Sequence, residues 1–145
     1  MIKAKKSLGQ NFLIDKKIID KISNILNIEN KTILEVGPGT GNLTSALLKK
    51  KPQKVFVIEK DDSLVSILKK EFKDKIEIIH NDILQINENL ITKEKLIVYG
   101  NLPYNISTEI LCKWILNLDD REVWFSNLIL MFQKEVADRI ISEHN

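Results

Sequence analysis

Several residue types are scarce in this sequence, and each scarcity argues against a class of protein. The 145 residues include one cysteine, Cys112, so no disulfide can form within the chain, and we expect a reducing, cytoplasmic location. The two histidines, His80 and His144, are far apart, and no Cys/His cluster has metal-ligand spacing, so we expect no metal. No apolar run approaches the roughly 20 residues of a membrane-spanning helix, so we expect no membrane partner.

The sequence also lacks a large excess of charge of one sign, because the formal net charge is only +2. Total charge therefore does not indicate a nucleic-acid partner, although the lysines are unevenly placed. Residues 1–21 hold six lysines against two aspartates, and a second run, "KKKPQK", spans 49–54. Either run is also consistent with an ordinary solvated face. With 43% hydrophobic residues, the length suits a single domain over 1–145.

Apolar periodicity alternates between helical and strand patterns along most of the chain. Helices are predicted at 15–27, 42–50, 61–72, 107–118 and 134–142, with Asp61 or Asp62 as the cap of the third. Strands are predicted at 31–37, 54–59, 75–82, 95–101 and 127–133. Such alternation predicts an α/β fold with a mostly parallel sheet and helices on both faces. Ligands of this architecture bind at the carboxyl ends of the strands.

The first predicted strand ends in "EVGPGTGNLT", which places Gly37, Gly39 and Gly41 just before a helix. Glycines there let backbone amides approach a ligand closely. The second strand ends in Glu59, whose carboxylate can accept two hydrogen bonds from a ribose diol. The G-x-G-x-G spacing differs from the G-x-G-x-x-G of dinucleotide sites, and no Lys-Ser/Thr pair follows the last glycine, which argues against a P-loop.

The third predicted strand is followed by Asp82, which can accept a hydrogen bond from the adenine amino group. A cofactor with a ribose and an adenine but no phosphate uses all three features, and S-adenosylmethionine is such a cofactor. Taken alone, Asp82 is equally well explained as a helix cap or turn residue.

The fourth predicted strand ends in "GNLPYNIST", residues 100–108. The Asn101 side-chain oxygen and the Leu102 carbonyl can accept from the two N–H bonds of an adenine N6, which frees its lone pair for methyl transfer and stabilises the developing positive charge. Pro103 restricts Leu102 to an extended conformation, and Tyr104 can stack on the target base. Without the glycine loop and the acids, an ordinary Asn-Pro turn is the simpler interpretation.

These segments together resemble the ribosomal RNA adenine N6,N6-dimethyltransferases. The matching pieces are "GQNFL" at 9–13, "EVGPGTGNLT" at 35–44, "VIEKD" at 57–61, "ND" at 81–82, "GNLPYNIST" at 100–108 and "QKEVADRI" at 133–140. The resemblance implies a Rossmann-like fold that binds S-adenosylmethionine and methylates two adjacent adenosines near the 3′ end of small-subunit rRNA, with a role in ribosome biogenesis. It also implies cofactor contacts from Gln10, Asn11, Leu13, Gly37, Gly39, Gly41, Glu59, Lys60, Asp82, Ile83 and Asn101, catalytic roles for Asn101, Leu102, Pro103 and Tyr104, and RNA contacts from Lys3, Lys5 and Lys6.

Three other functions remain open at this point. Relatives of this family include the 23S rRNA methylases that confer macrolide resistance, and the same fold can serve as a non-catalytic RNA-binding or ribosome assembly factor. A nicotinamide-dependent oxidoreductase is disfavoured by the glycine spacing and by Asp82. Members of the family continue past the position of Asn145 with further strands and a small helical domain. We therefore expect this chain to be a fragment or a shortened form that shows no measurable methylation by itself. We also expect it to be a monomer.

Overall fold

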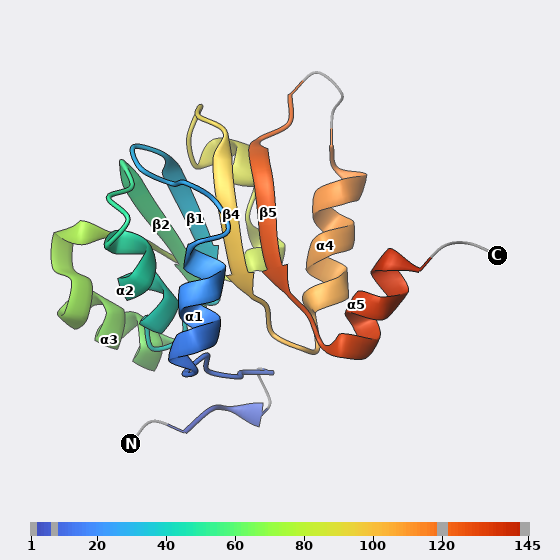
Figure 1. Ribbon diagram of the computed structural model, residues 1–145, viewed down its shortest axis with the longest axis horizontal. Coiled ribbons are helices and arrows are strands. Elements are labelled where there is room, and N and C mark those ends of the chain that lie inside the picture. The colour runs from blue at the N-terminus through green and yellow to red at the C-terminus, as the bar shows by residue number, and fades with distance from the viewer. Residues whose placement is uncertain (1–2, 7–8, 119–121, 143–145) are drawn as a thin grey trace.

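A computed structural model describes residues 3–6, 9–118 and 122–142, and its centre is a five-stranded sheet (Figure 1). The strands are β1 (Thr32–Val36), β2 (Lys54–Glu59), β3 (Glu77–His80), β4 (Leu96–Asn101) and β5 (Phe125–Met131). Their spatial order is β3-β2-β1-β4-β5, and every strand pair in the described residues is parallel. The predicted parallel α/β sheet is therefore confirmed.

An α-helix precedes β1, follows β5 and joins each pair of successive strands except β3 and β4, which are joined by short 3₁₀ turns. The α-helices are α1 (Lys16–Ser23), α2 (Asn42–Leu48), α3 (Asp62–Phe72), α4 (Ser107–Leu116) and α5 (Lys134–Ile141). Short 3₁₀ turns are η2 (Lys73–Lys75), η3 (Ile83–Gln85) and η4 (Glu88–Leu90). The first helix ends four residues before its predicted end, because Asn24 closes it by donating from its backbone and side chain to carbonyls of the last turn. Asp61 is the cap of α3, as one of the two predicted choices.

Each face of the sheet carries its own apolar core. On one face, Ile22 of α1, Leu47 of α2 and Leu68 of α3 pack with Val57 of the sheet. On the other face, Trp114 of α4 packs edge-on against Trp124, with ring centroids 5.6 Å apart. Because both faces are covered, the central strand β1 is buried along its whole length. This explains why that strand reads as a continuous apolar and β-branched run rather than an alternation.

The direction of strand addition reverses beside β1, which is the point at which parallel sheets of this kind bind ligands. β2 and β3 follow on one side of β1, whereas β4 and β5 lie on the other. Val36 pairs with Gly100, so the next residue of each segment, Gly37 after β1 and Asn101 at the end of β4, meet at the carboxyl edge. A Cβ placed on Gly37 would lie 3.0 Å from the Asn101 carbonyl oxygen.

The β5 side of the sheet is the less covered one. β5 is an outermost strand with no fully buried residue, and the helix that follows it, α5, has none either. Figure 1 shows α5 at the lower right of the molecule, beyond β5 and α4. Among the described residues, no helix is long and apolar enough to span a membrane, and no cluster of three metal-ligating side chains occurs.

Candidate active site

A cavity of about 240 Å³ opens at the carboxyl ends of β1, β2, β3 and β4. It is lined by Gly9, Gln10, Asn11, Phe12, Gly37, Gly39, Glu59, Lys60, Leu64, Asp82, Ile83, Leu84, Asn101, Pro103, Asn105 and Ile106. The cavity thus brings together residues from four strand ends and from the N-terminal segment. These are the strand ends at which the sequence predicted a ligand site.

The glycine loop between β1 and α2 fits closely against its neighbours. Gly37 has a positive φ of 70° and lines the cavity beside Asn101, so a side chain there would meet the Asn101 backbone. Gly41 has φ 86° and begins α2, but it does not line the cavity. A Cβ on Gly41 would lie 2.4 Å from the ring of Phe72, which makes this glycine a packing requirement between α2 and α3.

Glu59, at the end of β2, has a buried carboxylate held in a fixed orientation. Its Oε1 accepts from the backbone N–H groups of Lys60 and Asp61, each at 2.9 Å. Burial raises the pKa of Glu59 above its usual value despite these bonds. A carboxylate that two backbone amides hold in place is suited to receive the two hydroxyls of a ribose.

Glu35 lies beneath the glycine loop on β1 and was not predicted as a functional residue. Its Oε2 accepts from the Thr44 hydroxyl at 2.6 Å, and the side chain is fully buried. Burial raises the pKa of Glu35 to about 7, and the nearby charge of Glu59 adds to the rise. The bond from β1 to α2 fixes the two elements that flank the glycine loop.

Asp82, just after β3, is a cap residue, and its second carboxylate oxygen forms an ion pair. Its Oδ1 accepts from the Leu84 backbone N–H at 3.0 Å and caps η3, while its Oδ2 lies 2.7 Å from the Lys60 ammonium. That bond to Lys60 is the main reason the pKa of Asp82 is below its usual range. Asp82 therefore stays ionised at the mouth of the cavity, next to the apolar side chain of Ile83.

A half-buried cation, Lys113, supports the loop that carries Ile83. The Lys113 ammonium donates to the carbonyl oxygens of Ile83 at 2.8 Å and Ile86 at 2.5 Å, and to Glu88 Oε1 at 2.7 Å. Trp114 donates its indole N–H to the same Glu88 oxygen at 2.6 Å. The loop after Asp82 is thereby tied to α4, and sequence periodicity gave no signal for this link.

The end of β4 places Asn101 in the cavity with its amide held from one side. Asn101 Nδ2 donates to the Asn11 carbonyl oxygen at 2.6 Å. Pro103 also lines the cavity, whereas the Leu102 side chain is buried in the core beneath α4. Tyr104 is 43% exposed and lies outside the cavity lining, and its hydroxyl accepts from Asn11 Nδ2.

The N-terminal segment, of which residues 3–6 and 9–15 are described, crosses this edge of the sheet (Figure 1). Gln10 and Asn11 line the cavity, and the Phe12 ring lies against Gly39. Leu13 packs against the core instead, and its carbonyl oxygen accepts from Asn42 Nδ2 at 2.9 Å. Lys5 forms an ion pair with Asp61 at 2.6 Å.

Most of the predicted site residues meet at one place. Those that line the cavity are Gln10, Asn11, Gly37, Gly39, Glu59, Lys60, Asp82, Ile83, Asn101 and Pro103. Those outside its lining are Leu13, Gly41, Leu102 and Tyr104, and the lysines Lys3, Lys5 and Lys6 are exposed. The lining also includes Phe12, Leu64 and Leu84, which sequence reasoning missed because an apolar residue in a cavity has the same local pattern as one in a core.

The whole chain matches a family model. Residues 1–145 match the model described as "Ribosomal RNA adenine dimethylase". The chain is 62% identical over 144 residues to "Ribosomal RNA small subunit methyltransferase A" of Pelagibacter ubique, covering 99% of this chain and 55% of that protein. It is 49% identical to the protein of the same name from Mycoplasmopsis synoviae, covering 98% of this chain and 53% of the relative.

Solved structures agree with these matches. A dimethyladenosine transferase from Plasmodium falciparum superposes with a TM-score of 0.76 and 31% identity, over 92% of this chain and 47% of that chain. The 23S rRNA methyltransferase ErmE superposes with a TM-score of 0.72 and 27% identity, over 88% and 50% of the two chains. The fold is therefore the Rossmann-like fold of methyltransferases, as predicted. The chain spans about half the length of the curated relatives it matches, and across that span it belongs to the ribosomal RNA adenine dimethylase family.

Proposed function

We propose that this chain forms the cofactor-binding and catalytic part of an enzyme that transfers methyl groups from S-adenosylmethionine to N6 of two adjacent adenosines near the 3′ end of small-subunit rRNA. The observation that carries the proposal is the convergence of Gly37, Glu59, Asp82 and Asn101 on one cavity at four strand ends. The names of the curated relatives support the small-subunit target.

The cavity residues fit a nucleoside cofactor. Leu64, Ile83 and Leu84 offer apolar surface for an adenine ring, and the two acids beside them offer acceptors for polar edges. In this arrangement Glu59 holds the ribose hydroxyls and Asp82 accepts from the adenine amino group. Gly37 and Gly39 leave room for the methionine side of the molecule, and Lys60 holds Asp82 in its ionised form.

The target base would enter beside the loop that follows β4. When bound, S-adenosylmethionine supplies an electrophilic methyl group on its sulfonium. Asn101 Oδ1 and the Leu102 carbonyl accept from the two N–H bonds of the target amine, which holds its nitrogen lone pair free and stabilises positive charge as transfer proceeds. The proton is lost from the cationic adenine product, so no general base is required before transfer. Tyr104, already exposed, provides a stacking face worth about 1–3 kcal/mol.

The lysines of the N-terminal segment are the proposed phosphate contacts. Lys3 and Lys6 are exposed, and neither forms an ion pair among the described residues. Lys5 is paired with Asp61, so its contribution to phosphate binding requires that pair to loosen. Neutralised phosphates release counterions, so these lysines should set part of the salt dependence of RNA binding.

One experiment distinguishes the proposed function from two alternatives. A 23S rRNA methyltransferase shares the fold, as the ErmE superposition demonstrates, and a non-catalytic assembly factor needs no Asn101. The test uses a protein of the curated relatives' length that contains residues 1–145, called here the longer protein. It is incubated with radiolabelled S-adenosylmethionine and either small subunits or large-subunit rRNA that lack the methyl groups. We expect incorporation into two adjacent adenosines of the small subunit and none into 23S rRNA. Incorporation into 23S rRNA alone, or none into either substrate, would contradict the proposal.

A further inference from the structure

We propose that Asp61 is a positioning residue for the target amine. It anchors the strap, defined here as the described residues 5–6 and 9–13, and the strap's Asn11 carbonyl in turn sets the orientation of the Asn101 side-chain amide. This inference rests on the proposed function for the role of Asn101. It adds a residue, Asp61, that lines no part of the cavity and was expected only to cap a helix.

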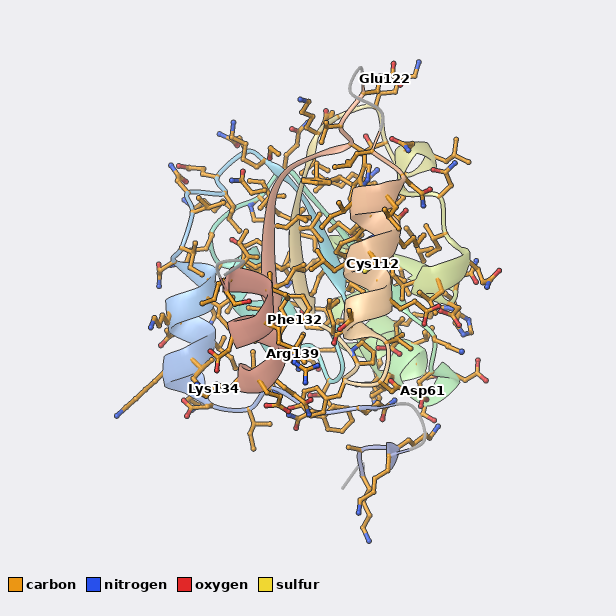
Figure 2. The ribbon with its side chains drawn as sticks, turned by 90° about the vertical axis from the view of Figure 1, so that its right-hand side faces the viewer. Asp61, Cys112, Glu122, Phe132, Lys134 and Arg139 are labelled. Carbon is orange, nitrogen blue, oxygen red and sulfur yellow. The ribbon has the colours of Figure 1, made fainter. Side chains whose placement is uncertain are left out.

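The first anchor of the strap is a buried carboxylate at the start of α3. The Asp61 side chain is 2% exposed, and its Oδ2 lies 2.6 Å from the Lys5 ammonium and 3.1 Å from Gln10 Nε2. The two strap residues are also joined, because the Lys5 N–H donates to Gln10 Oε1 at 2.8 Å. Figure 2 shows Asp61 at the lower edge of the molecule, where the N-terminal segment passes. The bond from Lys5 is the main reason the pKa of Asp61 lies well below its usual range.

The second anchor joins the strap to the loop after β4. Asn101 Nδ2 donates to the Asn11 carbonyl oxygen at 2.6 Å, the Tyr104 N–H donates to the Gly9 carbonyl oxygen at 3.4 Å, and Asn11 Nδ2 donates to the Tyr104 hydroxyl. The strap therefore bridges the β2–α3 junction, where Glu59 lies, and the loop that holds Asn101.

This second anchor determines which atom of the Asn101 amide is free. With Nδ2 bound to the Asn11 carbonyl, Oδ1 is left to accept from another group. Rotating the amide by half a turn would place Oδ1 2.6 Å from a second acceptor, without a proton between them. A target amine needs an acceptor at this position, so the orientation with Oδ1 free is the one that supports methyl transfer. Because the other end of the strap is held by Asp61, loss of that anchor should let the amide rotate.

Asp61 differs from an ordinary helix cap in what its second oxygen does. Asp15 caps α1 through Oδ1, which accepts from the N–H groups of Lys17 and Ile18, and among the described residues its side chain has no hydrogen bond or ion pair with the strap. Asp61 caps α3 through Oδ1, which accepts from the Ser63 N–H at 2.9 Å, and keeps Oδ2 for the strap. The two caps form a matched pair that separates helix capping from strap anchoring.

The first experiment measures hydrogen exchange at the Asn101 side-chain amide by NMR. Asp61→Asn keeps the shape and the cap but presents an amide NH₂ to Lys5 and Gln10, and Asp61→Ser keeps a cap with no reach to either. Asp15→Asn and Asp15→Ser are the controls. We expect the bonded Asn101 N–H to exchange about tenfold more slowly than a free amide in the wild-type and Asp15 variants, and to lose that protection in both Asp61 variants. Protection that persists in the Asp61 variants, or is lost equally in the Asp15 variants, overturns the proposal.

The second experiment is a double-mutant cycle on methyl transfer, with cofactor and small subunits saturating. We expect Asp61→Asn to lower the rate about tenfold in the wild-type background and to have no further effect in an Asn101→Ala background. Both changes remove the same interaction, that of Asn101 Oδ1 with the target amine. Independent, multiplicative effects overturn the proposal, since they mean that Asp61 does not act through Asn101. If the wild-type protein transfers no methyl group, the proposed function fails, and the exchange measurement still decides whether Asp61 orients Asn101.

Discussion

The two halves of the cavity are built by different means. The cofactor half consists of strand-end residues beside β1, β2 and β3, and its acids Glu59 and Asp82 are held by backbone N–H groups next to them in the chain. The target half consists of the end of β4 and the loop after it, in which Tyr104 is 43% exposed. Asn101, the last residue of β4, is held by Asn11, 90 residues away in the sequence.

This difference indicates that cofactor binding and methyl transfer can be lost separately. Because the two acids are oriented by backbone N–H groups close to them in the chain, cofactor binding should depend less on the strap than methyl transfer does. Orientation of Asn101 depends on the strap, and so does the position of Tyr104, whose backbone N–H and hydroxyl bond to Gly9 and Asn11. Single substitutions should therefore separate cofactor binding from methyl transfer.

The largest effect is expected from Asn101→Ala in the longer protein. The methylation rate should fall on the order of 10²–10³-fold, the usual loss when one preorganised hydrogen bond to a transition state is removed. Cofactor affinity should change little, since the interaction is made mainly with the target amine. Single-turnover rates and calorimetric titration with S-adenosylhomocysteine measure the two quantities. Asn89→Ala, on an exposed turn, is the control, and equal losses of rate and affinity would make Asn101 a structural residue instead.

A smaller effect, confined to the other half, is expected from Asp82→Ser. Serine preserves the cap of η3 but does not reach the adenine amino group, so cofactor affinity should fall about 10–100-fold, the range for a hydrogen bond to a charged group. The rate at saturating cofactor should stay close to that of the wild type. Titration of Asp82→Ser and of Asp74→Ser, an exposed acid outside the cavity, measures this. Unchanged affinity in Asp82→Ser would leave Asp82 as a turn residue only.

The buried acid beneath the glycine loop should make stability depend on pH. The pKa of Glu35 is raised from 4.5 to about 7, so its contribution to stability is fully present below pH 4.5 and is lost as the pH rises through 7. The loss should be of the order of 3 kcal/mol, because one pKa unit corresponds to about 1.4 kcal/mol. Glu35→Gln keeps a hydrogen-bond partner for Thr44 and should remove this decrease of the unfolding free energy with pH. Denaturant midpoints of the wild type and of Glu35→Gln, measured between pH 4.5 and 8, test this prediction. The same pH dependence in both proteins would contradict the raised pKa of Glu35.

The smallest effect concerns RNA. Replacing Lys3 and Lys6 by methionine should weaken RNA binding regardless of sequence and lower the salt slope by about one for each phosphate that is no longer neutralised. Lys69 and Lys70, in the last turn of α3, provide a control pair with the same change in charge. If the salt slope is the same in both double variants, the N-terminal lysines do not contact RNA phosphates and form only a solvated face.

Local sequence patterns predicted the features that depend on local chemistry. The strand runs, the glycines and the acids at strand ends are each readable from adjacent residues, and the parallel sheet brings them together. The pairing of Lys5 with Asp61 was not predictable, because ion pairs between distant segments leave no periodic signal. Lys5 was accordingly assigned to RNA alone, and Asp61 to helix capping alone.

Glu35 was missed for a related reason. One acid within an apolar strand reads as a tolerated exception until the structure shows its bond to Thr44. Gly41 has a packing role that its motif did not indicate, because a side chain at this position would meet the ring of Phe72. Packing between α2 and α3 is a long-range property that the motif does not contain.

The central claim is that the cofactor half is complete within residues 1–145 and independent of the target half. Calorimetric titration of residues 1–145 with S-adenosylhomocysteine, beside the same titration of the longer protein, tests it most directly. We predict dissociation constants that agree within about tenfold, a difference of at most about 1.4 kcal/mol, while the 145-residue chain shows no measurable methylation of small subunits. Absence of binding by residues 1–145, with tight binding by the longer protein, would contradict the claim.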